Sequence, residues 1–189
     1  MKKDIILAGV GGQGALTVAA VIAHAAAAAG FSVRQGEVHG MAQRGGAVLA
    51  HLRLSDSVIA SDLGPQGSAD LILSMEPLES LRYAPWLSPQ GVLISAGEPF
   101  VNIGDYPDLA AVLKAIAAFP LNRIVYAEAL AKEAGLSRTA NMVMVGAASP
   151  FLPIPKEILE NTITAMFAGK GTENANIRAF NLGRGEASK

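Results

Sequence analysis

A glycine-dense stretch near the amino terminus, Gly9-Val-Gly-Gly-Gln-Gly14, constrains this chain more than any other part of it. It follows a short apolar run at residues 4–9 and leads directly into an alanine-rich segment at residues 14–29. A buried strand that enters such a turn and then a helix is the arrangement that binds phosphate groups at a helix start. The order therefore predicts a βα unit of an α/β fold, with an anion site at the turn.

Each glycine in the spacing Gly9-x-Gly11-x-x-Gly14 is expected to have its own physical role. Gly9 permits the tight turn, Gly11 removes a side chain where a phosphate would approach, and Gly14 lets the helix pack close to the strand. Gly12 and Gln13 complete a loop beside backbone N–H groups that lack a partner within the helix. We expect these five residues to bind a cofactor; a glycine turn used only for packing is the alternative.

A second glycine-rich segment, residues 36–46, is typical of a functional loop because it also holds specific polar side chains. Arg44 precedes Gly45 and Gly46, and backbone N–H groups beside a guanidinium can form an anion-binding concavity. A structural turn with a solvated arginine is the alternative. His39 belongs to the same segment, but neither of the other two histidines has ligand spacing to it, so we expect no metal site.

Carboxylates follow two of the predicted strands. Residues 31–37 are expected to form the second strand, and Glu37 stands 23 residues after Gly14. In dinucleotide-binding folds an acidic residue about 20 residues after the glycines holds the ribose of NAD; a loop carboxylate without a ligand is the other interpretation. Glu76 follows strand 70–75, where stabilising the start of the next helix is its favoured role.

The remaining chain alternates between strand and helix patterns. Further strands are expected at residues 47–54, 58–59, 91–95 (after a turn at 89–91) and 123–127, and helices at 109–118, 128–134, 141–148, 156–167 and 172–183. This order, with an apparent strand insertion at 47–54, predicts a doubly wound α/β fold. We expect one Rossmann-like domain, residues 1–189, with helices on both faces of its sheet and a helical carboxyl-terminal segment.

Composition excludes several classes of function. The net charge is −1, so the chain has no basic field for nucleic acid or an anionic membrane. Charged residues make up 16%, below the ~25% of ordinary globular domains, which indicates a surface partly covered by a partner.

The absence of cysteine excludes a thiol nucleophile and cysteine-ligated iron–sulfur or zinc sites. No secretory signal or membrane-spanning run is evident, so we expect a cytoplasmic protein.

Taken together, the segments Gly9–Gly14 and Gly36–Gly46 closely resemble the gamma-type domain of 2-oxoacid:ferredoxin oxidoreductases. The carboxyl-terminal pattern, Glu173-Asn174 followed by Ala179-Phe-Asn-Leu-Gly183, is similar to the end of that domain. The resemblance therefore spans nearly the whole chain. Within the family, the chain looks most like the beta subunit of indolepyruvate:ferredoxin oxidoreductases.

The resemblance implies an accessory subunit of an oxidoreductase, inactive when isolated. In that family a larger subunit carries thiamine diphosphate and iron–sulfur clusters, an aryl-pyruvate is oxidatively decarboxylated to the aryl-CoA, and electrons pass to ferredoxin. By analogy this chain alone holds no cofactor and supplies no catalytic residue, but coenzyme A is a candidate ligand. Residues 11–14 would meet phosphate or the partner's cofactor region, and His39 and residues 44–46 would lie near the shared site. A homodimer is a candidate state of the isolated chain.

Three other functions fit parts of the pattern. A stand-alone NAD(P)-binding dehydrogenase would use the glycine fingerprint and Glu37, but 189 residues leave little room for a substrate domain. An adenylation protein for ubiquitin-like carriers would use the Gly-x-Gly-Gly-x-Gly loop, but the missing cysteines remove its usual thiol and zinc ligands. A non-catalytic ligand sensor is a further alternative.

Overall fold

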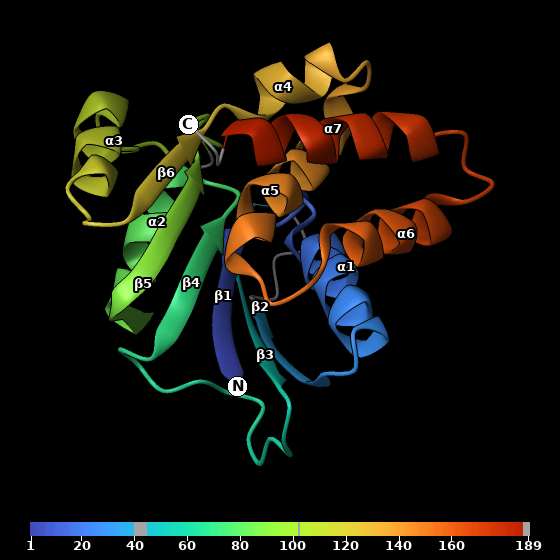
Figure 1. Cartoon of the computed structure of the whole chain (residues 1–189). Coiled ribbons are helices and arrows are strands. Elements are labelled where there is room, and N and C mark those ends of the chain that lie inside the picture. Colours follow the sequence, from blue (N-terminus) through green and yellow to red (C-terminus); the bar gives the residue numbers. More distant parts are fainter. Residues whose placement is uncertain (40–44, 102, 187–189) are drawn as a thin grey trace.

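The computed structural model, which describes residues 1–39, 45–101 and 103–186, contains a six-stranded sheet with helices on both faces (Figure 1). The strands are β1 Lys2–Val10, β2 Ser32–His39, β3 Ala47–Ser55, β4 Ala69–Ser74, β5 Leu87–Ala96 and β6 Asn122–Val125. The helices are α1 Ala15–Ala28, α2 Pro77–Arg82, α3 Leu109–Ala117, α4 Ala127–Glu133, α5 Ala140–Ala148, α6 Lys156–Phe167 and α7 Glu173–Glu186. Short 3-10 turns lie at Ala84–Trp86, Ser137–Thr139 and Ser149–Phe151.

The strand order β2-β3-β1-β4-β5-β6 puts a topological switch at β1. The chain leaves β1 through α1 toward β2 on one side, and returns on the other side of β1 at β4. The strands β1, β4, β5 and β6 are parallel, so their carboxyl ends share one edge of the sheet. Ligands of open α/β sheets bind at such a switch point, which here is where the glycine turn after β1 lies.

The strand β3 lies between β1 and β2 and is antiparallel to both. Its pairing with β1 is long and regular, from Lys2 opposite Ser55 to Val10 opposite Ala47. The inserted strand expected from the sequence is therefore present, and its place in the sheet moves β2 to the outer edge.

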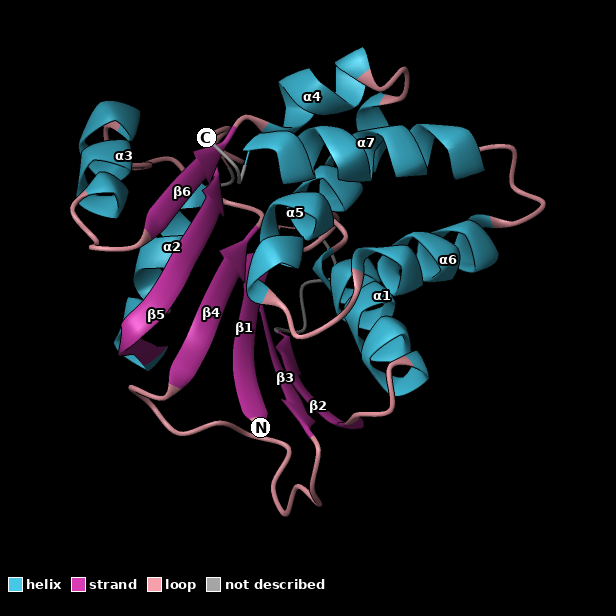
Figure 2. Ribbon diagram, viewed as in Figure 1, coloured by secondary structure: helices cyan, strands magenta, loops and turns pink. Residues whose placement is uncertain are grey.

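Two apolar layers cover the sheet (Figure 2). On one face, the alanine-rich α1 and the buried α5 join the larger core, with α6 and α7 packed against them. On the other face, α2 and α3 cover a smaller core that includes Ile72, Leu93 and Ile116. These observations confirm the predicted fold class, an α/β sheet with helices on both faces and a helical carboxyl-terminal segment. Among the described residues, no helix is long and apolar enough to cross a bilayer.

The helices α5 and α7 approach one another through two glycines. A Cβ on Gly146 would lie 2.0 Å from the carbonyl oxygen of Phe180, and a Cβ on Gly183 would lie 1.9 Å from that of Val143. Side chains larger than hydrogen are thus sterically excluded at both positions. This contact explains in physical terms why the carboxyl-terminal pattern ends in Phe-Asn-Leu-Gly183.

Two local predictions are wrong. Residues 58–59 form no strand; they belong to the loop that follows β3. The turn expected at residues 89–91 lies inside β5, which begins at Leu87. The pairing of β4 with β5 shifts register between Ala69 and Leu71, and an irregularity of this kind accommodates proline and glycine within a strand.

Candidate functional site

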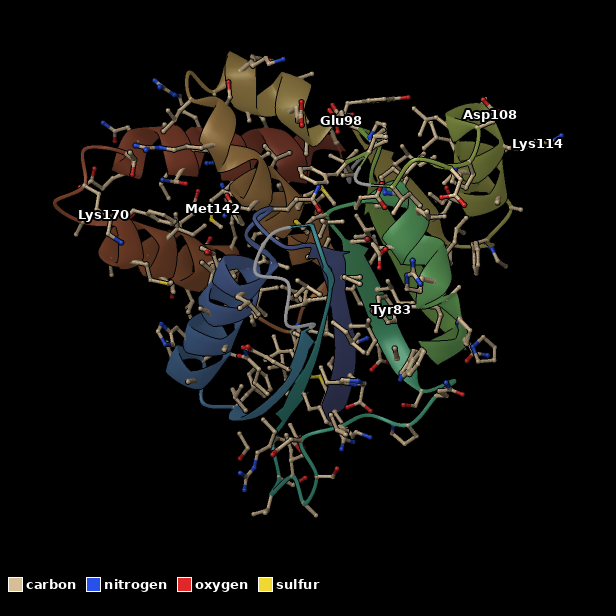
Figure 3. The ribbon with its side chains drawn as sticks, turned by 180° about the vertical axis from the view of Figure 1, so that it is seen from behind. Tyr83, Glu98, Asp108, Lys114, Met142 and Lys170 are labelled. Carbon is tan, nitrogen blue, oxygen red and sulfur yellow. The ribbon has the colours of Figure 1, made fainter. Side chains whose placement is uncertain are left out.

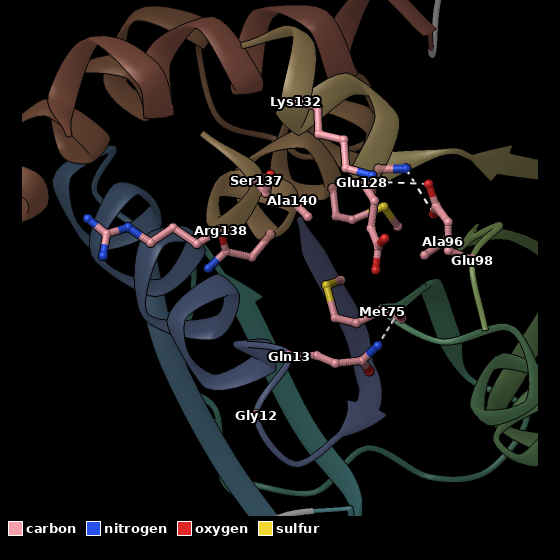
Figure 4. Close-up of a pocket in the computed structure, with 13 residues that line it drawn as sticks. Gly12, Gln13, Met75, Ala96, Glu98, Glu128, Lys132, Ser137, Arg138 and Ala140 are labelled. Carbon is pink, nitrogen blue, oxygen red and sulfur yellow. Dashed lines mark hydrogen bonds between the residues drawn. The ribbon is translucent and has the colours of Figure 1, made fainter. Parts of the chain in front are cut away.

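A pocket of about 410 Å³ opens at the carboxyl edge of the sheet, beside the topological switch (Figure 4). Gly12 and Gln13 of the turn after β1 form one side of it, and Met75 and Ala96 line it at the ends of β4 and β5. The opposite side comes from α4, the 3-10 turn after α4 and the start of α5. Its volume lies in the ~300–1,000 Å³ range of small-molecule sites.

The pocket combines charges of both signs with apolar side chains. Lys132 and Arg138 supply positive charge, and Glu98 and Glu128 supply negative charge. Lys132, Glu128 and Arg138 are exposed, whereas Glu98 is partly buried. An entering anion would therefore meet two accessible cations, a chemistry suited to phosphate or carboxylate groups. Met144 adds to the apolar lining.

Gln13 ties two strand ends together beneath this pocket. Its Oε1 accepts a hydrogen bond from the backbone N–H of Val10 over 2.8 Å, and its Nε2 donates to the carbonyl of Met75 over 3.0 Å. The amide thus bridges the carboxyl ends of β1 and β4. Gln13, which the sequence placed among cofactor-binding residues, lies at the pocket with its amide group engaged by the protein itself.

The other glycines of the turn serve different needs. Gly12 and Gly14 have φ angles of 105° and 82°, which side-chain-bearing residues rarely adopt. A Cβ on Gly12 would meet no atom within 4 Å, so this position is open. On Gly14 it would lie 2.9 Å from Nδ2 of Asn141, and on Gly9 it would lie 3.1 Å from Cβ of Met75. Gly12 thus leaves space at the pocket, while Gly9 and Gly14 permit close packing.

The two glycine segments meet in space. Gly11 donates its backbone N–H to the carbonyl of Gly46 over 2.9 Å, and Gly45 donates to the carbonyl of Gly11 over 3.4 Å. These bonds continue the β1–β3 pairing beyond Val10 and Ala47. The structure therefore brings Gly45 and Gly46, which lie more than 30 residues along the chain, directly beside the turn after β1.

The remaining predicted site residues are less closely grouped. Glu37 is exposed on the edge strand β2, where Gln35 donates a hydrogen bond to its carboxylate. Because β3 intervenes, Glu37 is two strand spacings, roughly 10 Å, from β1. His39 ends β2 opposite Val48. Arg44 lies outside the residues that the structure describes.

Glu76 performs the capping role favoured from the sequence. It is 1% exposed, and its Oε2 accepts a hydrogen bond from the backbone N–H of Glu79 in the first turn of α2. Its Oε1 accepts from the backbone N–H of Phe100 over 3.3 Å and from the hydroxyl of Tyr106. Burial raises the pKa of Tyr106, and its hydrogen bond to Glu76 raises it further, so the phenol keeps its proton. Glu76 thus holds Phe100 and Tyr106 at the end of β4.

Sequence reasoning missed the residues that form the far side of the pocket. Glu98, Lys132 and Arg138 belong to segments far from the glycine turn in the chain, and only folding brings them to it. One usable signal was present: Glu98 follows a predicted strand that ends at the same sheet edge as the turn. In the described parts of the chain, no group of three or more His, Cys, Asp or Glu could hold a metal ion.

Comparison with known proteins adds an independent line of evidence. Residues 4–186 match the family model described as pyruvate ferredoxin/flavodoxin oxidoreductase. The chain is 40% identical to the indolepyruvate oxidoreductase subunit IorB of Thermococcus kodakarensis, over 97% of this chain and 95% of that protein. These matches confirm the resemblance inferred from the two glycine segments.

Solved structures share the fold. The pyruvate oxidoreductase subunit PORC of Thermotoga maritima matches with a TM-score of 0.73 and 26% identity, over 98% of this chain and 96% of that one. The 2-oxoglutarate:ferredoxin oxidoreductase of Magnetococcus marinus matches with a TM-score of 0.79 and 22% identity, over 99% of this chain and 31% of that one. That enzyme was determined with 2-oxoglutarate, coenzyme A and succinyl-CoA bound. A domain of this fold therefore occurs both as a separate subunit and within a longer chain.

Proposed function

Because the chain belongs to the pyruvate ferredoxin/flavodoxin oxidoreductase family, we propose that it is the accessory subunit of an indolepyruvate:ferredoxin oxidoreductase. The observation that carries this proposal is the 40% identity to an indolepyruvate oxidoreductase subunit along nearly the full length of both chains. In this role the chain works beside a larger subunit that carries thiamine diphosphate and iron–sulfur clusters. The complex converts an aryl-pyruvate and coenzyme A to the arylacetyl-CoA thioester and carbon dioxide, and passes the electrons to ferredoxin.

In this proposal the pocket binds part of coenzyme A. Lys132 and Arg138 are exposed cations that can pair with phosphate groups, and Met75 and Met144 offer apolar surface to the rest of the molecule. A pocket of about 410 Å³ holds only part of so large a molecule, so the remainder extends toward the larger subunit. Coenzyme A supplies the thiol that takes up the acyl group. The residues of this chain bind and orient it.

The glycine turn contributes shape and access to the same pocket. Gly12 leaves its position open, and Gln13 holds the ends of β1 and β4 at a fixed separation. In this proposal Gly45 and Gly46 act by pairing with Gly11, and so by fixing the turn. We also propose that His39 and Arg44 contribute to the site shared with the larger subunit.

A stand-alone NAD(P) enzyme is less well supported by the geometry. In dinucleotide-binding folds the acidic residue that holds the ribose lies at the end of the strand next to β1. Here β3 occupies that place, and Glu37 is one strand further out. Titration calorimetry of the isolated chain with NAD and NADP tests this alternative, and we expect no tight binding.

Affinity purification from the native host tests the proposed function. A tagged copy of this chain should bring down one larger subunit that contains bound thiamine diphosphate and acid-labile sulfide. Recovery of the tagged chain without any such subunit, under conditions that preserve other complexes, would contradict the proposal.

A further inference from the structure

We infer that Glu98 is a positioning residue: its carboxylate fixes the start of α4 and thereby sets where Lys132 stands in the pocket. The inference rests on the proposed function, because it takes Lys132 to pair with a phosphate of coenzyme A. It concerns a different residue, which acts through α4 rather than by touching the ligand.

Glu98 caps α4 from a different part of the chain. It lies two residues beyond the end of β5, and both of its oxygens are used (Figure 4). Oε2 accepts a hydrogen bond from the backbone N–H of Ala127 over 3.1 Å, and Oε1 accepts from that of Glu128 over 3.0 Å. The residue at the N-cap position of α4, Tyr126, makes no side-chain hydrogen bond to the helix. Glu98 therefore satisfies two of the backbone N–H groups at the start of α4 that have no partner within the helix.

The position of Glu98 is itself fixed on both sides. Before it, Gly97 donates its backbone N–H to the carbonyl of Val125 over 2.9 Å, which extends the pairing of β5 with β6. After it, Phe100 donates its backbone N–H to Glu76, a carboxylate that is 1% exposed. The backbone that carries Glu98 is thus held on both sides, which limits where its carboxylate can lie, as a positioning group requires.

The helix α4 depends on such a cap because it is short. It has seven residues, Ala127–Glu133, so its first turn is a large share of its length and few hydrogen bonds remain within it. Lys132 lies near its end, and it lies four residues after Glu128, on the same helical face. Fraying of the first turn would let this face move relative to Gly12 and Gln13 across the pocket (Figure 4).

The test compares two helix caps in the assembled complex. Glu98→Ala removes the cap of α4. Asp108→Ala removes the cap of α3, where the carboxylate accepts a hydrogen bond from the backbone N–H of Ala111 over 3.1 Å. Figure 3 labels Asp108 on α3, away from Glu98, and α3 contributes nothing to the pocket lining among the described residues. Glu98→Ala should raise the KM for coenzyme A about fivefold and leave the KM for indolepyruvate unchanged. Asp108→Ala should lower only the thermal midpoint.

Two further variants separate the possible outcomes. Glu98→Gln keeps one acceptor oxygen and the size of the side chain, so it should fall between wild type and Glu98→Ala, and it replaces the latter if that variant does not fold. In either variant of the isolated chain, amide hydrogen exchange should be faster at residues 127–131 than in wild type. Equal exchange there, or equal increases in the KM for both substrates, would overturn the inference.

Lys132→Met distinguishes a failure of this inference from a failure of the proposed coenzyme A site. If Lys132→Met raises the KM for coenzyme A but neither Glu98 variant does, Glu98 has no positioning role and the pocket assignment stands. If neither Lys132→Met nor the Glu98 variants change that KM, coenzyme A does not use this pocket; this inference and the pocket assignment then both fail, while the accessory-subunit role is tested separately by co-purification.

Discussion

The backbone N–H of Gly11 and the carbonyl of Gly46 are joined by a 2.9 Å hydrogen bond, and this bond unites the two glycine segments of the chain. It continues the antiparallel β1–β3 pairing past Val10 and Ala47, so the turn after β1 is braced from the side by the segment that precedes β3. A change in either segment should therefore disturb the pocket. The two motifs act as one structural unit.

A bulky residue at position 12 should impair activity without preventing assembly. Gly12 has a φ of 105°, which costs about 1–2 kcal/mol for a residue with a side chain, and the new side chain would project into open space at the pocket. Gly12→Leu should lower turnover of the complex by more than about tenfold. Gly30→Leu is the matched control, since Gly30 has a φ of 88° and open space around it but lies at the far end of α1. Full activity in Gly12→Leu would show that the glycines of this turn serve only packing.

A methyl group at the crossing of α5 and α7 should destabilise the fold. In Gly183→Ala the new Cβ would lie 1.9 Å from the carbonyl oxygen of Val143 in the present geometry, so α5 and α7 must move apart. We expect a loss of about 1–3 kcal/mol in the free energy of unfolding, measured in urea. Gly185→Ala, in the same helix with no atom within 4 Å of the added Cβ, should instead be neutral or stabilising by up to about 1 kcal/mol. Similar effects of both substitutions would contradict this account of the crossing.

Lys132, the cation on α4, should affect the KM for coenzyme A and not that for the other substrate. A contact between an exposed lysine and a phosphate is worth up to about 1 kcal/mol, so Lys132→Met should raise the KM for coenzyme A by up to roughly fivefold. The effect should weaken as ionic strength rises, because added salt screens the wild-type interaction. Lys114→Met on α3, exposed and away from the pocket (Figure 3), is expected to leave that KM unchanged. Steady-state kinetics of the complex with varied coenzyme A measures both.

The free energy of unfolding should decrease as the pH falls, over a range set by the lowered pKa of His51. Burial lowers the pKa of His51, Arg53 lowers it further and Asp4 opposes this; Nδ1 of His51 accepts a hydrogen bond from the backbone N–H of Gly64. Because the folded-state pKa lies below the unfolded value near 6.5, this contribution is complete above that pH and is lost as pH falls through the folded pKa. His51→Asn retains an acceptor that does not titrate, so the loss of unfolding free energy just below pH 6.5 should become shallower. An unchanged slope in His51→Asn would rule the explanation out.

The sequence was sufficient where local order decides the structure. The βα unit around Gly9 and Gly14 and the inserted strand at 47–54 were both predicted, because hydrophobic runs and glycine turns act on neighbouring residues. It was insufficient where distant segments meet. The order of residues does not reveal that β3 pairs between β1 and β2, and that placement takes Glu37 away from the turn.

The candidate site, too, could be predicted only where it depends on a local motif. The glycine side of the pocket follows from a motif, whereas its other side depends on how Glu98 after β5 reaches the start of α4. Such a contact joins residues about 30 positions apart and leaves no periodic pattern in the chain. Charged residues at strand ends and after glycine-capped helices were the available signals. They indicate candidates but do not show which of them face one cavity.

Reconstitution of the complex from its purified subunits shows whether this chain is needed for turnover. The larger subunit is assayed for indolepyruvate- and coenzyme A-dependent reduction of ferredoxin, or of a viologen, with and without this chain. We predict a rapid reaction only when both subunits are present, and none from this chain alone. Full activity of the larger subunit by itself would contradict the claim that this chain completes the active complex.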